Sequence, residues 1–504
     1  MAIQVVTTEQ STLVTIRTKH TTYQMKADEY GVLLHLWYGA SVEGDMSYLL
    51  DYPDVGFSGN LYEAGNRRTY SLNTLPLEYA TEGVGDFRIP AVAATHADGS
   101  NALDLRYQSY SIHKGKYAIA GLPAVYADED EAETLEIVLK DTATDLQVTL
   151  RYGVLPELDM LTRCVSIQNL GTTPITLTKA ASFCLDLPYG KWEWMHFHGR
   201  HAMERITERT PLIHGIQESS STRGTSSHHQ NPTAILCTPD CTETNGSCFG
   251  AAFLYSGSFQ TKIEYDQMRQ ARMVMGLHPD LFRWELQPNA TFDTPEVLFT
   301  YSDSGLETLS HRFQKTIREH VCRGKYQKIE RPVLINNWEA TYFDFNEEKI
   351  LKIAEEAARL GVDMLVLDDG WFGKRDDDCS GLGDWFVNEQ KLKGGLGTLV
   401  QKVKALGMRF GIWFEPEMVS EDSDLYRTHP EWAIQIPGRK PMRGRYQLLL
   451  DLSNPDVQDY LYERISDILN SADISYVKWD MNRSISDWYT ALLPANRQGE
   501  LPHR

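Results

Sequence analysis

The periodicity of apolar residues changes at Pro332, and this change limits the chain to a small set of folds. From residue 1 to about 300, short stretches of alternating polar and apolar residues, rich in β-branched side chains, are separated by Asp, Gly and Pro. That pattern predicts a large β-sandwich. After Pro332, strand-like runs alternate with segments of helical spacing, which is typical of right-handed β-α units around a parallel sheet. We therefore expect a sandwich domain at residues 1–304, a linking helix and linker at 305–331, and an α/β domain at 332–504.

Start and stop signals divide the second half into β-α units. Asn346 is predicted to cap the first helix and Gly361 to end it, while Gly407 ends the second helix. The third helix is predicted to begin at Ser453, followed by a strand that begins at Ile474. The three strands before that one are predicted at residues 333–337, 364–367 and 410–414.

The charge balance excludes two classes of partner. The 504 residues carry a formal net charge of −20 at pH 7, so an average surface would repel nucleic acid and anionic membranes. Eleven Trp and 25 Tyr residues supply flat aromatic faces that suit the rings of a neutral sugar. Residues 1–10 show no cationic start followed by an apolar run, and no stretch reaches the roughly 18 apolar residues of a membrane span. We expect a cytoplasmic protein with no membrane or nucleic-acid partner.

The cysteines do not indicate a metal site. The chain has seven, which is an odd number, and Cys237, Cys241 and Cys248 lack the close pairs and partner histidines of a zinc site. We expect reduced thiols, no bound metal and no cofactor.

Polar residues gather where the predicted strands of the second half end. In an eight-stranded β/α barrel this edge carries the active site. Lys478 and Asp480 would share one face of the last strand, which would place a cation beside a carboxylate and keep it ionised for attack on a sugar carbon. A purely structural Lys–Asp pair is the alternative, and the acidic run 376–378 is expected to be a solvated loop. The residues at the strand ends are Asn336, Asn337 and Trp338; Asp368, Asp369 and Trp371; Trp413, Glu415 and Glu417; and Lys478, Asp480 and Asn482.

Four motifs resemble the α-galactosidases of glycoside hydrolase family 36. They are Arg-Pro-Val-Leu-Ile-Asn-Asn-Trp-Glu-Ala-Thr-Tyr-Phe-Asp at 331–344, Leu-Asp-Asp-Gly-Trp-Phe-Gly at 367–373, Trp-Phe-Glu-Pro-Glu-Met at 413–418 and Lys-Trp-Asp-Met-Asn at 478–482. Gly-Asp-Phe-Arg at 85–88 and Ser-Ser-His-His-Gln-Asn-Pro at 226–232 resemble the N-terminal β-supersandwich of the same family. The resemblance implies a β-supersandwich followed by an incomplete (β/α)8 TIM barrel, with about four of the eight strands present. It also implies a small-molecule α-galactoside as substrate and a homo-oligomer, a tetramer.

The resemblance assigns a role to ten residues. Asp480 would be the nucleophile that forms a covalent galactosyl-enzyme. Asp368 and Asp369 would hold galactose hydroxyls, and His201 stands where some relatives have a tryptophan. The full set of substrate-binding residues would be Asp54, His201, Trp338, Asp368, Asp369, Trp413, Arg445, Lys478 and Asn482.

A second carboxyl group is expected but has no counterpart in the sequence. A retaining glycosidase needs one about 5 to 5.5 Å from the nucleophile to protonate the leaving oxygen. In the family this group is an aspartate well beyond the nucleophile, and the sequence stops at Arg504. We therefore expect a retaining exo-α-galactosidase that hydrolyses terminal α-D-galactosyl residues of oligosaccharides such as melibiose and raffinose, with the general acid missing from this chain.

Two alternatives remain open. One is a relative that transfers galactose to another sugar, as the enzymes that form raffinose and stachyose do. The other is a catalytically inactive chain that binds sugar or a partner subunit. Residues 1–504 expressed alone are expected to be inactive and poorly soluble, because four β-α units cannot close a barrel.

Overall fold

The computed structural model describes residues 2–504, which divide into two compact units. The first unit extends to Gln327, and the second runs from Lys328 to Pro502. Each unit has its own hydrophobic core. No helix within residues 2–504 is long and apolar enough to span a membrane.

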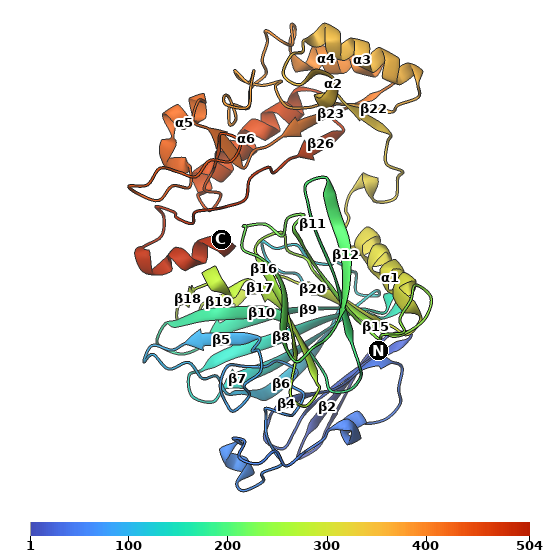
Figure 1. The fold of residues 1–504 in the computed structure, drawn as a ribbon, viewed down its shortest axis with the longest axis vertical. Helices are drawn as coiled ribbons and strands as arrows, with labels where there is room; N and C mark the ends of the chain where they lie inside the picture. Colours follow the sequence, from blue (N-terminus) through green and yellow to red (C-terminus); the bar gives the residue numbers. More distant parts are fainter. Residues whose placement is uncertain (1) are drawn as a thin grey trace. The chain divides into compact units, whose positions relative to one another are not determined.

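The first unit consists of twenty strands, one α-helix and short 3₁₀ turns (Figure 1). The strands are β1 Ile3–Thr7, β2 Thr12–Arg17, β3 Thr21–Ala27, β4 Leu33–Ala40, β5 Val92–Thr95, β6 Leu105–Lys114, β7 Glu133–Asp141, β8 Leu146–Leu155, β9 Met160–Asn169, β10 Ile175–Leu187, β11 Glu193–Arg200, β12 Met203–Pro211, β13 Gly215–Ser221, β14 Gln230–Cys237, β15 Cys248–Phe253, β16 Phe259–Tyr265, β17 Ala271–Leu277, β18 Trp284–Leu286, β19 Thr291–Asp293 and β20 Val297–Ser302. The 3₁₀ helices among residues 2–504 are η1 Met46–Leu49, η2 Tyr62–Ala64, η3 Pro156–Leu158, η4 Pro279–Leu281, η5 Lys325–Gln327, η6 Pro430–Trp432 and η7 Ala495–His503.

These strands form three antiparallel sheets. A four-stranded sheet has the order β1-β2-β3-β4, and a six-stranded sheet has the order β13-β16-β17-β10-β18 with β5 paired to β10. The ten-stranded sheet has the order β12-β11-β14-β15-β20-β9-β8-β7-β6 with β19 paired to β9. The β-rich first half predicted from the sequence is confirmed.

Alternating burial explains why these segments are strands. In β7, Ile137 and Leu139 are buried and lie opposite Leu150 and Val148 of β8. Their neighbours Glu136, Val138 and Lys140 are only half-buried. Each fully buried aliphatic side chain contributes about 1.5–3 kcal/mol by leaving water. The period of two residues therefore fixes which face of the sheet turns to the core.

Helix α1, Gly305–His320, packs closely on strand β15. A Cβ atom at Gly250 of β15 would lie 2.7 Å from the Phe313 ring and 3.0 Å from Leu309 of the helix. The missing side chain at Gly250 therefore allows the helix to approach the sheet. Leu309 also packs against Cys237, Cys241 and Cys248, and burial raises the pKa of the Cys237 thiol to about 11.

The second unit is built on a four-stranded parallel sheet (Figure 1). Its strands, in sheet order, are β21 Leu334–Asn336, β22 Met364–Leu367, β23 Arg409–Phe414 and β26 Tyr476–Trp479. Helices α3 Glu347–Arg359, α4 Gly395–Ala405 and α6 Pro455–Ser471 lie between them in the chain, together with the short helices α2 Trp338–Thr341 and α5 Asp424–Thr428. The alternation of strand and helix predicted after Pro332 is confirmed.

Most predicted helix boundaries in this unit match the structure, and one is wrong. Asn346 caps α3, because its Oδ1 accepts a hydrogen bond of 3.0 Å from the Lys349 N–H. Gly361 follows that helix with a φ of 85°, a conformation that glycine adopts without strain. The start of α6 at Ser453 is wrong, since Asn454 is the cap and accepts from the Asp456 N–H at 3.0 Å.

One pair of strands was missed altogether. β24, Met418–Ser420, and β25, Gln447–Leu449, form a two-stranded antiparallel sheet between β23 and α6. Three-residue strands are too short to show a period of two in the sequence.

Candidate active site

Parallel register brings the predicted strand-end residues together at one edge of the second unit. Trp413 of β23 lies opposite Lys478 of β26, and Leu367 of β22 lies opposite Ile412. The residues that follow each strand therefore leave the sheet at a common edge, where Asp368, Glu415 and Asp480 lie. This is the edge on which α/β sheets bind ligands.

The carboxylate of Asp480 is held in a fixed orientation. Its Oδ2 accepts hydrogen bonds from the indole Nε1 of Trp413 at 3.1 Å and from Nδ2 of Asn482 at 2.9 Å. Its Oδ1 accepts only the N–H of Met481, at 3.1 Å. Trp413 is itself buried, and its backbone carbonyl accepts from the indole of Trp371 at 2.9 Å. Asp480 is thus half-buried and oriented, with one oxygen less engaged than the other.

The predicted pairing of Lys478 with Asp480 is wrong. Lys478 Nζ instead donates to Oδ2 of Asp368 at 3.0 Å. The Asp480 N–H still donates to the Phe414 carbonyl of β23 at 2.8 Å, so the backbone pairing continues to Asp480, and the ion pair is absent because the long Lys478 side chain reaches Asp368 at the end of β22 instead. Lys478 therefore neutralises Asp368, which follows β22. The Trp413 indole and the Asn482 amide hold Asp480, which follows β26.

Asp368 is the centre of a polar group made by three strand ends. Besides Lys478, Asn336 Nδ2 donates to the same Oδ2 atom. The Asp368 backbone N–H donates to Oδ1 of Asn337 at 2.8 Å, and the Asn337 side chain is fully buried. Both asparagines were noted as strand-end residues in the sequence, but neither was given a role.

Arg375 is a residue of this site that sequence reasoning missed. Its Nε and Nη2 donate to the two oxygens of Asp369 at 3.0 and 2.9 Å, and the guanidinium is fully buried. Burial raises the pKa of Asp369, and the ion pair with Arg375 opposes that rise. Its sequence signal was a cation six residues after Asp369, between Lys374 and the acidic run 376–378.

Glu415 is a buried acid beside the proposed nucleophile. Its Oε1 accepts the backbone N–H of Asn482 at 3.1 Å, and its Oε2 accepts Nε2 of Gln447 at 2.9 Å. Burial raises the pKa of Glu415 to about 7; the hydrogen bond from Asn482 opposes the rise, and the nearby charges of Asp480 and Asp369 add to it. The carboxyl therefore joins β25 to the segment after Asp480.

This raised pKa predicts that stability falls as pH increases. A Glu side chain ordinarily titrates near 4.5, so between about pH 4.5 and 7 the folded chain holds a proton that the unfolded chain has released. The free energy of unfolding should fall through this window by about 3 kcal/mol and be constant above it. The glutamine side chain in Glu415→Gln has no titrating proton, so this variant should lose most of the pH-dependent fall in the free energy of unfolding. Urea unfolding at about pH 5 and pH 8 measures it.

The variant suits its site and has a matched control. The new NH₂ group of a glutamine at position 415 would face the Gln447 NH₂ group, but a flip of the Gln447 amide turns toward it the Oε1 atom, an acceptor that is now buried without a partner. Glu348→Gln is the control, because Lys352 lowers the pKa of that exposed glutamate and its removal should not flatten the fall. An unchanged pH dependence in Glu415→Gln would contradict the assignment.

Trp338 and Arg445 lie on loops after strand ends of the same unit. Trp338 begins α2 and contacts the rings of Tyr342 and Phe343 edge-on. Arg445 is exposed, has a φ of 49° and donates to Oδ1 of Asp378 at 3.0 Å. Asp378, which belongs to the acidic run predicted to be a solvated loop, therefore has a defined partner in Arg445.

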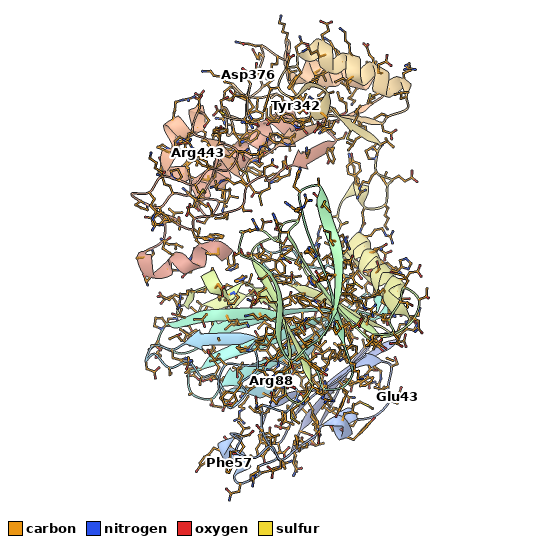
Figure 2. All side chains as sticks on the ribbon, viewed as in Figure 1. Glu43, Phe57, Arg88, Tyr342, Asp376 and Arg443 are labelled. Carbon is orange, nitrogen blue, oxygen red and sulfur yellow. The ribbon has the colours of Figure 1, made fainter. Side chains whose placement is uncertain are left out.

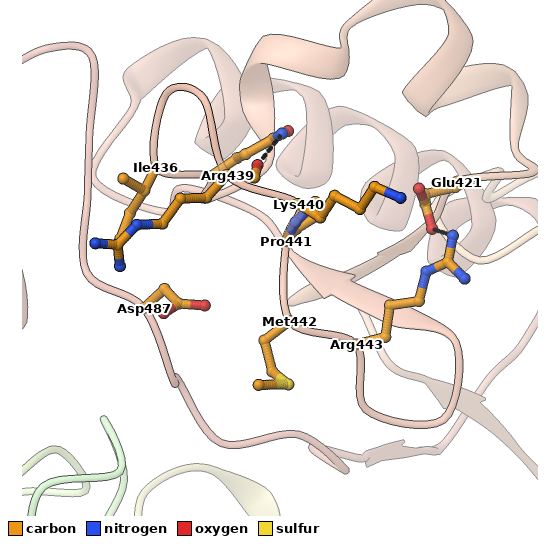
Figure 3. A pocket seen from close by; sticks show the side chains of 9 residues that line it. Glu421, Ile436, Arg439, Lys440, Pro441, Met442, Arg443 and Asp487 are labelled. Atoms are coloured by element: carbon orange, nitrogen blue, oxygen red, sulfur yellow. Dashed lines mark hydrogen bonds and ion pairs between the residues drawn. The ribbon is translucent and has the colours of Figure 1, made fainter.

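A cavity of about 710 Å³ lies next to the loop that carries Arg445 (Figure 3). It is lined by Glu421, Gln435, Ile436, Arg439, Lys440, Pro441, Met442, Arg443 and Asp487. Arg443 pairs with Glu421 across 2.5 Å, as the dashed line in Figure 3 marks. Arg483, which follows Asn482, donates to the Met442 carbonyl and so joins the cavity loop to the segment after Asp480.

Two predicted site residues lie in the first unit. Asp54 is on an exposed loop, where its Oδ1 accepts from the Gly56 N–H at 2.9 Å and from Arg68 Nη2 at 3.0 Å. His201 is exposed in the turn between β11 and β12. The other eight predicted residues lie in the second unit, where hydrogen bonds join Asp480 to Trp413 and Asn482, and Lys478 to Asp368.

Comparison with known proteins identifies both halves of the chain. The family model "Glycosyl hydrolase family 36 N-terminal domain" matches residues 31–287, and the model "Melibiase" matches residues 291–504. The bifunctional alpha-galactosidase/sucrose kinase AgaSK of Mediterraneibacter gnavus is 54% identical over 95% of this chain. Alpha-galactosidase AgaA of Geobacillus stearothermophilus is 46% identical over 97% of it.

Solved structures agree with the sequence matches. The crystal structure of the family 36 α-galactosidase AgaB from Geobacillus stearothermophilus has a TM-score of 0.96, with 45% identity, and the match covers all of this chain and 69% of AgaB. The chain spans about half of AgaSK (51%) and about two thirds of AgaA (67%). With an N-terminal family 36 domain, a Melibiase catalytic domain and this level of identity, the chain belongs to glycoside hydrolase family 36.

Proposed function

We propose that this chain supplies the nucleophile, and most of the sugar-binding groups, of a retaining exo-α-galactosidase. The observation that carries the proposal is the Asp480 carboxylate, fixed by Trp413 and Asn482 at the edge where the parallel strands end. An oriented, ionised carboxylate next to hydroxyl-binding groups is what covalent glycoside hydrolysis needs. The catalytic domain in this proposal begins at about residue 332.

The reaction would proceed through two displacements at the anomeric carbon. Oδ1 of Asp480, the less engaged oxygen, attacks C1 while the C1–O bond to the leaving sugar breaks and its oxygen takes a proton from a general acid. The product of this step is a β-galactosyl ester of Asp480. Water then attacks C1, gives its proton to the same group and releases α-galactose, so two inversions give net retention.

We propose that the general acid is none of the acids at these strand ends. Both oxygens of Glu415 are held, by Asn482 and Gln447, and the side chain is 1% exposed. Glu417 accepts the Trp479 indole N–H at 3.0 Å. Glu415 therefore has no oxygen open to a leaving group, and Glu417 is already bonded through one of its two oxygens.

The polar group around Asp368 suits galactose hydroxyls. A hydroxyl both donates and accepts, and the Asp368–Lys478–Asn336 group offers carboxylate acceptors beside ammonium and amide donors. Asp54 and His201 are proposed to complete sugar recognition. Melibiose and raffinose are the proposed substrates, since a Geobacillus stearothermophilus AgaA variant has been crystallised with raffinose and another with stachyose.

A fusion protein tests the proposed activity. Residues 1–504 joined to the part of AgaA that they do not cover should hydrolyse aryl α-galactosides and release α-galactose first, as followed by NMR of the anomers. The unfused chain should be inactive, because the general acid lies elsewhere. Release of β-galactose first would contradict retention, and full activity of the unfused chain would contradict the assignment of the acid.

We also propose a homo-oligomer. Tyr48, Phe57, Tyr62 and Phe87 of the first unit are 76, 106, 98 and 84% exposed, and Figure 2 shows the Phe57 side chain extending from its loop. Large exposed aromatic residues on neighbouring loops are typical of protein interfaces. Light scattering after gel filtration should give a multiple of the 57.4 kDa chain mass, and Phe57→Ser should lower it. An unchanged mass in that variant would exclude this loop as the interface.

A further inference from the structure

A second cavity, in the first unit and lined by none of the residues of the proposed reaction, has the composition of a sugar-binding pocket. It has a volume of about 220 Å³ and lies among β4, β15 and the segment that follows β10. Six of its lining residues are aromatic: Trp37, Tyr38, Tyr189, Trp192, Phe249 and Tyr301. A space of this size accepts a group of about one sugar ring.

The two indole rings are fixed before any ligand arrives. Trp37 donates its Nε1–H to the Ala40 carbonyl at 3.1 Å, and Trp192 donates its own to the Tyr189 carbonyl at 3.0 Å. Each ring is only half-buried although its polar edge is already satisfied. Rings held in this way lose little conformational entropy when a ligand stacks on them.

Glycines make room for these rings. A Cβ atom at Gly39 would lie 2.9 Å from the Trp37 ring, and one at Gly190 would lie 2.9 Å from the Trp192 ring. Gly190 also has a φ of 109°, a backbone conformation that favours glycine independently of the contact with Trp192. The loop geometry therefore depends on leaving space for both indoles.

The polar groups of the cavity are hydroxyls and not charges. Ser247 Oγ and the Tyr301 hydroxyl are 2.9 Å apart, and such a pair uses one of its two protons internally and leaves the other to donate. His35 is the only lining residue among the Asp, Glu, Lys, Arg and His types, and it is paired with buried Glu78 at 3.0 Å. An ionic ligand would find no counter-charge here, whereas a neutral molecule with an apolar face and hydroxyl groups fits.

We propose that this cavity is a second carbohydrate-binding site that takes one neutral hexopyranose unit between Trp37 and Trp192. The sugar ring stacks on the indole faces, and its hydroxyls bond with Ser247 and Tyr301. Its role would be to hold an oligosaccharide on the sandwich unit, independently of the residues around Asp480.

Fluorine NMR of the chain labelled with 5-fluorotryptophan tests both sites in one titration. Signals of Trp37, Trp192, Trp338 and Trp413 are assigned by single Trp→Phe substitutions, and raffinose and methyl α-galactoside are the probes. The signals of Trp37 and Trp192 should shift saturably, with a Kd on the order of millimolar. Ser247→Ala should weaken this binding about fivefold, as for the loss of one hydrogen bond.

The controls separate this inference from the proposed function. Tyr62→Ala removes an exposed aromatic residue outside the cavity and should leave the titration unchanged. Sorbitol, a polyol without a ring, should give no saturable shift. If only the signals of Trp338 and Trp413 shift, up to about 100 mM sugar, the second binding site is disproved and the proposed function remains intact. Shifts of Trp37 and Trp192 that follow protein dilution instead of sugar would assign the cavity to contacts between copies of the chain.

Discussion

Replacement of Asp480 by alanine in the fusion protein is expected to lower kcat by on the order of 10⁴-fold or more. The side chain provides the attacking oxygen of the first displacement in the proposed mechanism, and Trp413 and Asn482 would then have no acceptor at that position. Added azide should fill the vacated space and attack from the same side, so that β-galactosyl azide accumulates. Initial rates on an aryl α-galactoside and NMR of the azide product provide the measurement.

A matched acid shows whether the loss is specific. Asp376→Ala removes an exposed carboxylate of the same unit, which pairs only with Lys391 at 2.9 Å, and should change kcat less than twofold. Substantial hydrolysis by Asp480→Ala, or formation of an α-galactosyl azide, would mean that another carboxylate is the nucleophile.

Replacement of Arg375 by methionine is expected to destabilise the second unit by about 3–5 kcal/mol. The guanidinium is fully buried and forms both hydrogen bonds to the Asp369 oxygens, so its loss leaves a buried carboxylate without a counter-charge. Asp369 should then take up a proton, since burial already raises its pKa. Urea unfolding near neutral pH measures the effect.

A double variant separates charge from packing. Arg375→Met with Asp369→Asn removes the unpaired charge and should recover part of the stability lost by Arg375→Met alone. Arg427→Met is the surface control, because that arginine is 48% exposed and solvent screens its pairs with Asp422 and Asp424. Equal losses in Arg375→Met and Arg427→Met would show that the buried pair is not important for stability.

The sequence predicted the strand-end positions well because local rules determine them. Asn346 has the short polar side chain of a helix cap, and residues 364–367 form a wholly apolar run, so their places in the structure follow from neighbours in the chain. The edge that collects Asp368, Glu415 and Asp480 follows from parallel register alone.

The partners of these residues could not be predicted in the same way. Lys478 was assigned to Asp480 from strand alternation, but its long side chain crosses to Asp368, 110 positions away in the chain. Arg375 and Gln447 have partners that depend on how a loop and a short strand fold back. Such contacts are long-range, and periodicity contains no information about them.

The link from Arg483 to the Met442 carbonyl means that the cavity loop and the segment after Asp480 cannot change shape independently. A single guanidinium connects the loop beside the 710 Å³ cavity to the residues that follow Asp480. Substitutions at Arg439 or Lys440 that reshape the cavity would therefore also move the segment that follows Asp480. Libraries that vary Arg439 and Lys440 while keeping Arg483 and Met442 constant should retain more active variants than libraries that vary all four positions, because the link that positions this segment is then preserved.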